Sequence, residues 1–429
     1  MTGVSGNELP DHHGSHQELL WSGDHVKSRR IDAIIVPTAR PPAYLDAAAG
    51  LACELGCTLV TLHSKQWTTA AKAAQRLPKS VDLIAIDVPD PALLRLPRFL
   101  TSQWAAHKIF PRQPSRPPTD LSAKRNLGIV LSRLLAWSRV LFLDDDITEL
   151  NPADVLRAGG LLDTHNAVGL HVCGFHDHSV VCHAYRDAGG SQEAFIGGGA
   201  LAVHVQRSTS FFPEIYNDDW FFLLDGDKGI QPVAVTGQVK QYPYDPFRNP
   251  ERARAEEFGD VLAEGIYWLL DQHLSITDAD QAHWARFLDK RRQFIDRVLA
   301  MVADSDDLDS AQKAMRTAAL KGSLGRLALI TPQLCVNYLL AWRSDRQEWQ
   351  RYVEELPVGL DLERALAWLS SDGAPPLNWQ PRRSRYLTAK PPALREPAAG
   401  ELSGPQFVAE PALASHPRRT SEHVGMLVD

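Results

Sequence analysis

Short apolar runs alternate with amphipathic helical patterns along the first third of the chain. Residues 140–143 are apolar at every position, as expected for a short strand buried on both faces of a parallel sheet. Three earlier runs are also mostly apolar. The four predicted strands are residues 31–36, 58–62, 81–88 and 140–143. Helix-forming segments separate them, and this alternation predicts an α/β fold with a mostly parallel, doubly wound sheet and right-handed crossovers.

The pattern changes after residue 167. Runs such as "AVGLHV", "SVVCHAY" and "ALAVHV" predict shorter strands between glycine-rich turns. Leu, Trp and Ile then recur among charged residues at helical spacing. The helices predicted on this basis cover about residues 251–273, 278–303, 310–330 and 334–355. We expect four regions: a flexible tail over 1–30, an α/β domain over 31–250, a helical extension over 251–372, and a Pro- and Arg-rich, poorly ordered tail over 373–429.

The composition, with 44% hydrophobic and 23% charged residues, is that of a soluble globular protein. A formal net charge of −7 argues against a general nucleic-acid binder. The five cysteines form no CxxC pair, which favours a reducing cytoplasm over a disulfide framework. No apolar run reaches the length of a membrane span, and the first thirty residues lack the apolar stretch of a signal peptide.

Three consecutive carboxylates, Asp144, Asp145 and Asp146, directly follow the strand at 140–143. Open α/β sheets bind ligands at the carboxyl ends of their strands, so the triplet lies where a ligand site is expected. Adjacent carboxylates repel one another unless a cation or hydrogen-bond donors offset their charge. A solvated turn with a capping Asp is the alternative that involves no ligand.

Two kinds of enzyme place acidic residues at such a strand end. In a sugar transferase a divalent cation offsets the charge on the departing nucleoside diphosphate, and it needs hard oxygen ligands. If the chain were a phosphatase of the haloacid dehalogenase type, Asp144 would be the phosphorylated nucleophile and Asp146 the acid/base. "DGDKG" at 225–229 loosely matches the later acidic motif of that family. However, the Asp-bearing strand normally opens that domain, whereas here at least three strand-helix units precede it.

The order of motifs between residues 31 and 225 resembles that of GT-A fold glycosyltransferases, particularly the large inverting group called family 2. "IIVPTAR" resembles the first strand with its donor-binding loop, and "LIAIDV" a third strand whose end holds the base of the nucleotide. The most specific match is "KRNLGIVLSRLLAWSRVLFLDDDI", similar to the family's Arg-Asn, helix, strand and Asp-x-Asp. "FIGGGALAV" resembles the glycine-rich acceptor-side segment, and "IYNDDWFFL" the acidic pair followed by Trp.

The resemblance implies a metal-dependent transferase that moves a sugar from a nucleotide-sugar donor to a hydroxyl acceptor with inversion. It implies Mg²⁺ or Mn²⁺ as cofactor, held by Asp144 and Asp146. The residues that it assigns to the donor are Pro37, Thr38, Arg40, Asp87, Lys124, Arg125, Asn126, Asp144 and Asp145, and those that it assigns to the acceptor are Gly197, Gly198, Gly199 and Trp220. Asp219 is the implied general base, supported by Asp218 where the family more often has Glu.

Other features have no assigned role at this point. "HVCGFHDHSVVCH", residues 171–183, is rich in His and Cys, but its spacing matches no familiar zinc motif. No later histidine can be assigned as a third metal ligand. The helical extension is a candidate for covering the acceptor or for homo-oligomerisation. The basic segment "QPRRSRYLTAK" is a candidate for peripheral contact with the inner face of a membrane, with a flexible tail as the alternative. A catalytically silent binding protein on the same fold is the remaining functional alternative.

Overall fold

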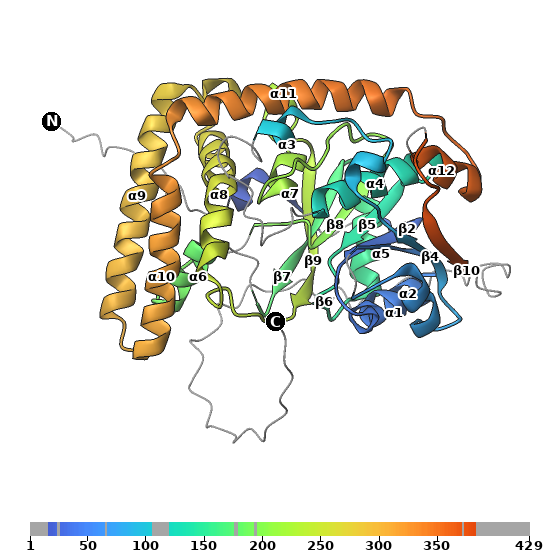
Figure 1. The fold of residues 1–429 in the computed structure, drawn as a ribbon, viewed down its shortest axis with the longest axis horizontal. Coiled ribbons are helices and arrows are strands. Elements are labelled where there is room, and N and C mark those ends of the chain that lie inside the picture. Colours follow the sequence, from blue (N-terminus) through green and yellow to red (C-terminus); the bar gives the residue numbers. More distant parts are fainter. Residues whose placement is uncertain are drawn as a thin grey trace, which may run out of the picture. The chain divides into compact units, whose positions relative to one another are not determined.

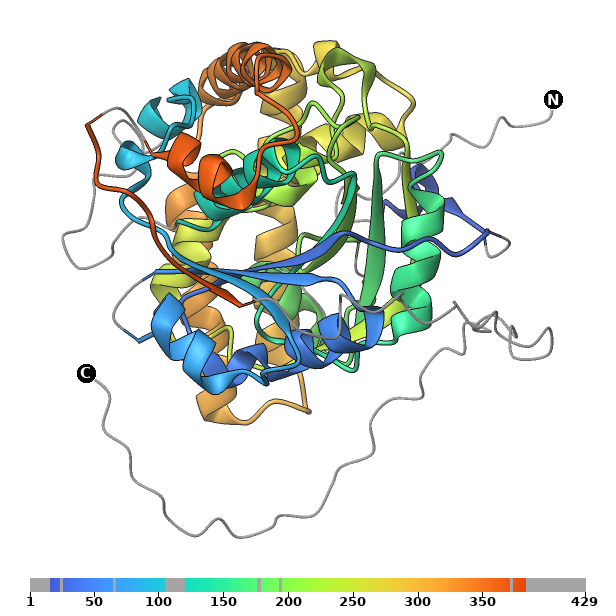
Figure 2. The ribbon, with the colours of Figure 1, turned by 90° about the vertical axis from the view of Figure 1, so that its right-hand side faces the viewer.

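Two apolar cores, one on each face of a central sheet, organise the fold (Figures 1 and 2). The structure is a computed structural model, and all residues that it describes belong to one unit, Met1–Pro391. The described residues are 16–23, 26–64, 67–104, 120–175, 179–192, 195–370 and 373–382. Helices cover both faces of the sheet (Figure 2), so the alternating pattern of the sequence produces the predicted α/β architecture.

Within the described residues the sheet has ten strands, in the order β1-β9-β7-β8-β5-β2-β3-β4-β10, with β6 paired to β9. The strands are β1 (Trp21–Ser22), β2 (Ala33–Thr38), β3 (Thr58–His63), β4 (Asp82–Asp87), β5 (Arg139–Leu143), β6 (Ile147–Thr148), β7 (Ala167–Cys173), β8 (Ala200–His204), β9 (Val233–Gln241) and β10 (Asn378–Arg382). β2 to β5 run parallel, and β8 runs antiparallel to both β5 and β7.

The direction of the strands brings their functional ends together. The carboxyl ends of β2, β3, β4, β5, β7 and β9 lie along one edge of the sheet, together with the amino end of β8. We call this the site edge; β2, β4 and β5 reach it at Thr38, Asp87 and Leu143, and β8 starts there at Ala200. The predicted ligand-binding residues therefore share one edge, as a parallel sheet requires.

The helices between the first parallel strands follow the predicted pattern. In chain order the helices are η1 (Gln17–Leu19), η2 (Pro42–Leu45), α1 (Asp46–Leu55), α2 (Ala70–Arg76), η3 (Pro91–Leu93), α3 (Leu100–Trp104), α4 (Leu121–Leu134), α5 (Pro152–Leu161), α6 (Val180–Asp187), α7 (Asp218–Phe222), η5 (Gly226–Lys228), α8 (Pro250–Asp271), η6 (Ile276–Asp278), α9 (Gln281–Asp304), α10 (Ser310–Leu327), α11 (Pro332–Glu354) and α12 (Leu362–Leu369). α4 packs tightly on β2 and β5, since a Cβ at Gly128 would lie 3.0 Å from Ile35 and from Phe142.

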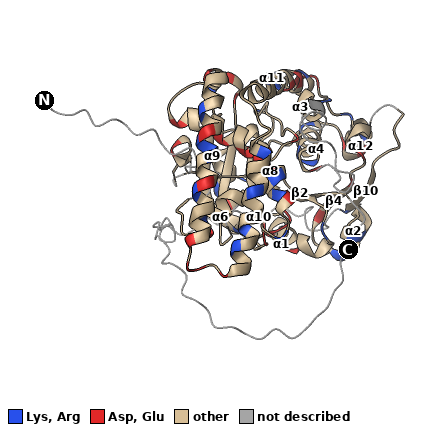
Figure 3. Cartoon of the chain, turned by 60° about the vertical axis from the view of Figure 1, so that its left-hand side comes forward, with Lys and Arg blue, Asp and Glu red and all other residues tan. Residues whose placement is uncertain are grey.

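Four long helices, α8 to α11, form the helical extension with bounds close to those predicted. Figure 1 shows α8 between α9 and the sheet, with α11 running across the top. Trp284, Trp342 and Trp349 are fully buried in this region, while acidic and basic residues are interspersed along α9 (Figure 3). In the described part of the chain no single helix is long and apolar enough to cross a membrane, and α10 and α11 qualify only as a pair bent by 80°.

Three predictions of local structure are wrong. "SVVCHAY" forms α6 rather than a strand, because Ser179 caps a helix by accepting a hydrogen bond from the Cys182 N–H. Residues 378–382, expected in the poorly ordered tail over 373–429, form β10 and pair with the outer edge of β4. Residues 17–22, expected in the flexible tail over 1–30, form η1 and β1, and β1 pairs with β9. In the last two cases long-range pairing overrides local composition.

Candidate active site

The side chains that follow β2 and β5 meet at the site edge. Thr38 Oγ1 donates a hydrogen bond of 2.6 Å to Asp145. Arg40 Nη1 lies 2.9 Å from Asp145 and 3.0 Å from Asp146. Burial raises the pKa of Asp145, while the hydrogen bond from Thr38 and the charge of Arg40 oppose that shift. The loop after β2 thus offsets the repulsion within the acidic triplet.

A buried arginine joins the acidic triplet to the acidic pair in α7. The guanidinium of Arg125 donates to Asp218 at 2.8 Å and to Asp144 at 3.1 Å, and only 3% of the Arg125 side chain is exposed. Burial acts to lower the pKa of Arg125, but the two carboxylates raise it overall. Burial raises the pKa of Asp144 to about 6 and also raises that of Asp218, in both cases against the charge of Arg125. Three predicted site residues from different segments therefore form one cluster, in which Arg125 and Asp218 are buried and Asp144 is half-buried.

The glycine-rich segment before β8 supplies a backbone donor to this cluster. The Gly198 N–H lies 2.5 Å from Asp219 Oδ2, and the Trp220 N–H donates to Asp219 Oδ1 at 2.9 Å. A Cβ at Gly198 would lie 2.6 Å from the guanidinium carbon of Arg125, so a larger residue would displace that side chain. Asp218 is buried and Asp219 is half-buried, so Asp219 is the member of the pair that a substrate can reach.

The other residues assigned to the acceptor lie around the same cluster. The Gly199 carbonyl accepts a hydrogen bond of 2.9 Å from the Asp144 N–H, and Gly197 is buried one residue before Gly198. Trp220 is half-buried, and its ring lies 4.8 Å from that of Tyr267 in α8. The structure therefore brings the predicted acceptor side against the predicted donor side. Contact of these residues with an acceptor stays a prediction.

Two residues of the "KRN" segment have internal partners. Lys124 Nζ donates to the Thr38 carbonyl at 2.8 Å and to a side chain of the loop after β3 at 2.6 Å, so it ties two strand ends together. Asn126 uses both ends of its amide on the backbone of Phe212, at 2.8 and 2.9 Å. The Phe212 ring in turn faces the Arg125 guanidinium at 5.4 Å. Lys124 and Asn126 therefore hold the backbone around the site in place. Their predicted contact with a nucleotide-sugar donor stays untested.

Asp87 and Pro37, also assigned to the donor, lie at the site edge. The carboxylate of Asp87 accepts hydrogen bonds from the Ala70 N–H at 2.6 Å and from Asn378 at 2.5 Å. It therefore holds the start of α2 and the start of β10. Pro37 is a buried residue of β2. Binding of a nucleoside by either residue stays a prediction.

The sequence did not single out two side chains that touch the cluster. Ser122 Oγ donates to Asp218 at 2.9 Å. It precedes Arg125 by three residues on α4, so helical spacing was the signal that could have found it. Gln241, at the end of β9, places Nε2 3.5 Å from Asp146 Oδ2, and its Oε1 is buried with no hydrogen-bond partner among the described residues. No sequence signal marks Gln241, because its position depends on the pairing of β9 with β6.

The oxygen atoms at the site edge suit a divalent cation that is also bound by phosphate oxygens of a ligand. Among the described residues no three His, Cys, Asp or Glu side chains are close enough to hold a metal ion by themselves. Mg²⁺ is commonly bound by one or two carboxylates together with phosphate oxygens and water. Asp144 and Asp146 supply hard oxygens of this kind, and the buried, unpaired Oε1 of Gln241 is a third in the described part of the chain.

Among the described residues His63 ends β3 at this edge, but its two ring nitrogens are taken by the hydroxyls of Thr68 and Thr61, at 2.7 and 2.8 Å. His183 stacks on Phe175 at 4.9 Å, and residues 176–178 of the His-rich segment lie outside the described residues. His283 is buried on α9, where Nε2 lies 3.0 Å from the Gly265 carbonyl, and burial lowers its pKa to about 4. His283 therefore serves the packing of the helical extension.

Comparison with known proteins gives a distant structural likeness. No family model matches the sequence, and no curated protein matches it. The solved structures that match include a mannosyltransferase from Pyrobaculum calidifontis in complex with GDP-Man and Mn²⁺. It is 14% identical, the match covers 75% of this chain and 89% of that chain, and the TM-score is 0.34. A likeness of this size establishes neither a family nor an activity for the present chain.

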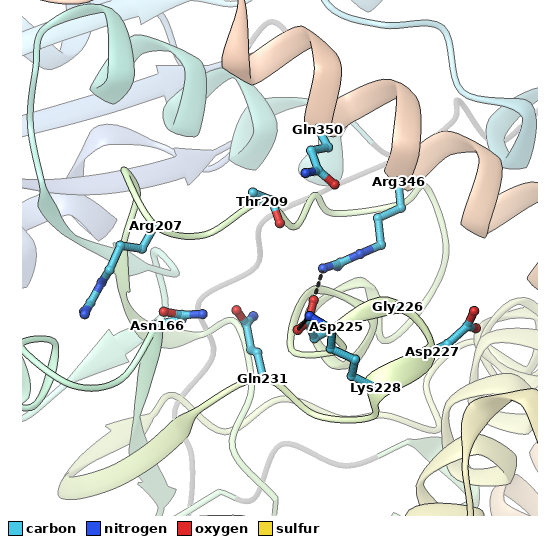
Figure 4. Close-up of a pocket in the computed structure, with 10 residues that line it drawn as sticks. All are labelled: Asn166, Arg207, Thr209, Asp225, Gly226, Asp227, Lys228, Gln231, Arg346 and Gln350. Carbon is cyan, nitrogen blue, oxygen red and sulfur yellow. Dashed lines mark hydrogen bonds and ion pairs between the residues drawn. The ribbon is translucent and has the colours of Figure 1, made fainter.

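A separate polar pocket of about 510 Å³ lies where β7 begins and β8 ends, at the edge of the sheet opposite the site edge (Figure 4). Arg346 of α11 pairs there with Asp225 at 2.6 Å. Arg207 donates to nearby backbone carbonyls. The "DGDKG" loop at 225–229 lines this pocket, so the later acidic motif of the phosphatase alternative lies away from Asp144.

Proposed function

We propose that this chain is a metal-dependent GT-A glycosyltransferase, similar to family 2, that moves a sugar from a nucleotide-sugar to a hydroxyl acceptor with inversion. One observation carries the proposal: Arg125 joins the strand-end carboxylate Asp144 to the acidic pair of α7. Direct sugar transfer needs a phosphate-binding centre and a base on opposite sides of one anomeric carbon. The two acidic centres, linked by the single buried cation of Arg125, are our candidates for these two groups.

Asp219 is suited to the role of general base. Its two carboxylate oxygens are held by different backbone donors, the N–H groups of Gly198 and Trp220, and the side chain is half-buried. Asp219 takes the proton of the acceptor hydroxyl while that oxygen attacks the anomeric carbon and the bond to the nucleotide breaks. Attack from the face opposite the leaving group inverts the centre. General base catalysis of this kind contributes roughly 10²- to 10⁴-fold.

The donor is assigned to the ends of β2 and β5. Asp144 and Asp146 would hold Mg²⁺ or Mn²⁺, which offsets the charge of the departing diphosphate when it is bound. Arg40 has 43% of its side chain exposed, so a diphosphate oxygen can replace one of its two carboxylate partners. Thr38 and Lys124 keep the loop after β2 in place for that contact. The five cysteines, all among the described residues, form no disulfide, which supports action in a reducing compartment such as the cytoplasm.

The alternatives are less well supported. A phosphatase of the haloacid dehalogenase type would need its later acidic motif beside Asp144, but the 225–229 loop lies at the opposite edge of the sheet. In a silent binding protein, the positions of Asp144 and Asp218 would be unfavourable without benefit to function. Burial raises the pKa of both carboxyls and so disfavours their charged forms. Carboxylates with shifted pKa values are typical of active sites.

A thermal-shift screen of the full chain tests the proposal. Nucleoside diphosphates are added one at a time, with and without Mn²⁺, and the melting temperature is recorded. We expect one or two nucleotides to raise it only when Mn²⁺ is present, since bound ligand stabilises the native state. A response to phosphate mimics such as BeF₃⁻, with none to nucleotides, would support the phosphatase and contradict the proposal.

A further inference from the structure

The turn that carries the acidic pair has an unusual backbone. Asn217, the residue before α7, has φ 63° and ψ 35°, the left-handed conformation that Asn tolerates better than most residues. Its side chain makes no hydrogen bond to α7. Instead Asn217 Nδ2 donates at 3.1 Å to Asp260 of α8. The conformation at Asn217 sets the direction in which Asp218 and Asp219 leave the turn.

α8 holds this turn on both sides of the acidic pair. Asp260 bonds to Asn217, before the pair, and the Tyr267 hydroxyl donates at 2.9 Å to the Trp220 carbonyl, after the pair. Asp260 and Tyr267 are seven residues apart, two turns along the same face of the helix. The two elements also approach closely, because a Cβ at Gly259 would lie 2.2 Å from the Tyr216 carbonyl oxygen.

The contact points on α8 are themselves fixed by the helical extension. Arg291 of α9 is 0% exposed and donates to Asp260 at 2.6 Å. The same guanidinium holds Glu257 through two bonds of 2.9 and 3.0 Å. Tyr267 is 0% exposed. An ion-paired carboxylate and a fully buried hydroxyl have little freedom to move, so α8 is a rigid support for the turn.

We propose that Asp260 and Tyr267 are positioning residues that aim Asp219 at the acceptor hydroxyl, and that this is a function of the helical extension. The inference rests on the function proposed for Asp219. A displacement of about 1 Å at a catalytic group can cost about 10²-fold in rate. Neither residue belongs to the donor side, so loss of either contact lowers turnover and leaves the affinity for the nucleotide unchanged.

Small substitutions isolate each contact. Tyr267→Phe removes only the hydroxyl. Asn217→Gly keeps the left-handed backbone accessible and removes only the amide. Asp260→Ala deletes the acceptor, while Asp260→Asn retains an oxygen for Asn217. We expect kcat for the best nucleotide-sugar, measured as nucleoside diphosphate release, to fall about 10-fold or more in the first three variants. Asp260→Asn should keep most of the wild-type kcat. The calorimetric Kd for the nucleoside diphosphate with Mn²⁺ should be unchanged in all four variants.

Glu257→Gln is the matched control. It weakens the same Arg291 cluster without touching the turn, so it should lower the melting temperature and leave kcat as in the wild type. Equal turnover in wild type, Tyr267→Phe and Asn217→Gly would overturn the inference, even if Asp260→Ala fails to fold. A fall in kcat for Glu257→Gln as large as for Asp260→Ala would also overturn it. Failure of the wild type to bind or turn over any nucleotide-sugar would count against the proposed function instead.

Discussion

The guanidinium of Arg125 donates a hydrogen bond of 2.8 Å to the carboxylate of Asp218, and both side chains are buried. The same arginine also reaches Asp144, so one cation lies between the strand-end triplet and the acidic pair. Burying the charges of Arg125 and Asp218 is costly unless each is paired. Their arrangement therefore ties the position of the proposed base to that of the proposed donor site.

Arg125→Met should destabilise the protein strongly, because it leaves the buried Asp218 and the half-buried Asp144 without their cation. Removing one partner of a buried ion pair commonly lowers the free energy of unfolding by about 3–5 kcal/mol. Urea unfolding at pH 8 measures the loss. The double variant Arg125→Met/Asp218→Asn should recover part of it, because one unpaired charge is then absent. A double variant no more stable than Arg125→Met would show that the pair does not carry the effect.

The stability of the protein without ligands should depend on pH through Asp144. Its folded-state pKa of about 6 lies above the usual value of about 4, so the native state holds this proton more tightly than the unfolded chain. The contribution is fully present below about pH 4 and is lost as the pH rises through about 6. Asp144→Asn should therefore gain stability relative to the wild type between pH 5 and pH 8, by at most about 3 kcal/mol.

Asp163→Asn is the control for this pH dependence. Asp163 is partly exposed, and hydrogen bonds from Arg29 and Arg139 lower its pKa despite some burial. The stability difference between this variant and the wild type should stay constant from pH 5 to pH 8. The same constant difference for Asp144→Asn would show that Asp144 titrates normally.

Gly198→Ala should disturb the contacts of Gly198 with Arg125 and Asp219. The added methyl group would lie 2.6 Å from the guanidinium carbon of Arg125, and the Gly198 N–H would move away from Asp219. We expect turnover to fall by about 10²-fold. The control is Gly50→Ala, where the new methyl group has nothing within 4 Å apart from its chain neighbours and the backbone of its own helix. Equal turnover in the two variants would contradict the close packing at Gly198.

Local pattern was sufficient for most of the fold. Mostly apolar runs placed β2 to β5, and helical spacing placed α4 and the four helices from α8 to α11. β10 and β1 could not be predicted, because edge strands depend on a partner far away in the sequence. α6 was missed because consecutive β-branched residues in "SVV" suggest a strand, and only the cap at Ser179 favours a helix.

The residues of the site were more predictable than their contacts. A parallel sheet brings strand ends to one edge, so motifs at 37–40 and 144–146 had to meet there. Nothing in the sequence indicates that Arg125 lies between Asp144 and Asp218, or that Asn126 bonds to a backbone. Side-chain partners depend on helix orientation and burial, which a linear motif does not encode. The support from α8 was invisible for the same reason.

Asp146→Asn should weaken the metal-dependent binding of nucleoside diphosphate. Asp146 is 8% exposed and is held by Arg40 when no ligand is present. Loss of one charged partner in a buried contact commonly costs about 2–5 kcal/mol, which calorimetry with Mn²⁺ measures directly. Asp163→Asn, which removes a carboxylate from the opposite edge of the sheet, should bind like the wild type. An unchanged affinity in Asp146→Asn would remove this residue from the donor site.

The anomeric configuration of the product tests the central claim most directly. Wild type and Asp219→Asn are incubated with the nucleotide-sugar and Mn²⁺ identified by the screen, and product formation is followed by NMR. Asp219→Asn keeps the shape but not the basic oxygen, so it should bind donor normally and turn over roughly 10²- to 10⁴-fold more slowly. The wild-type product should carry the configuration opposite to that of the donor. Retention of configuration, or full turnover in Asp219→Asn, would contradict direct displacement with Asp219 as the base.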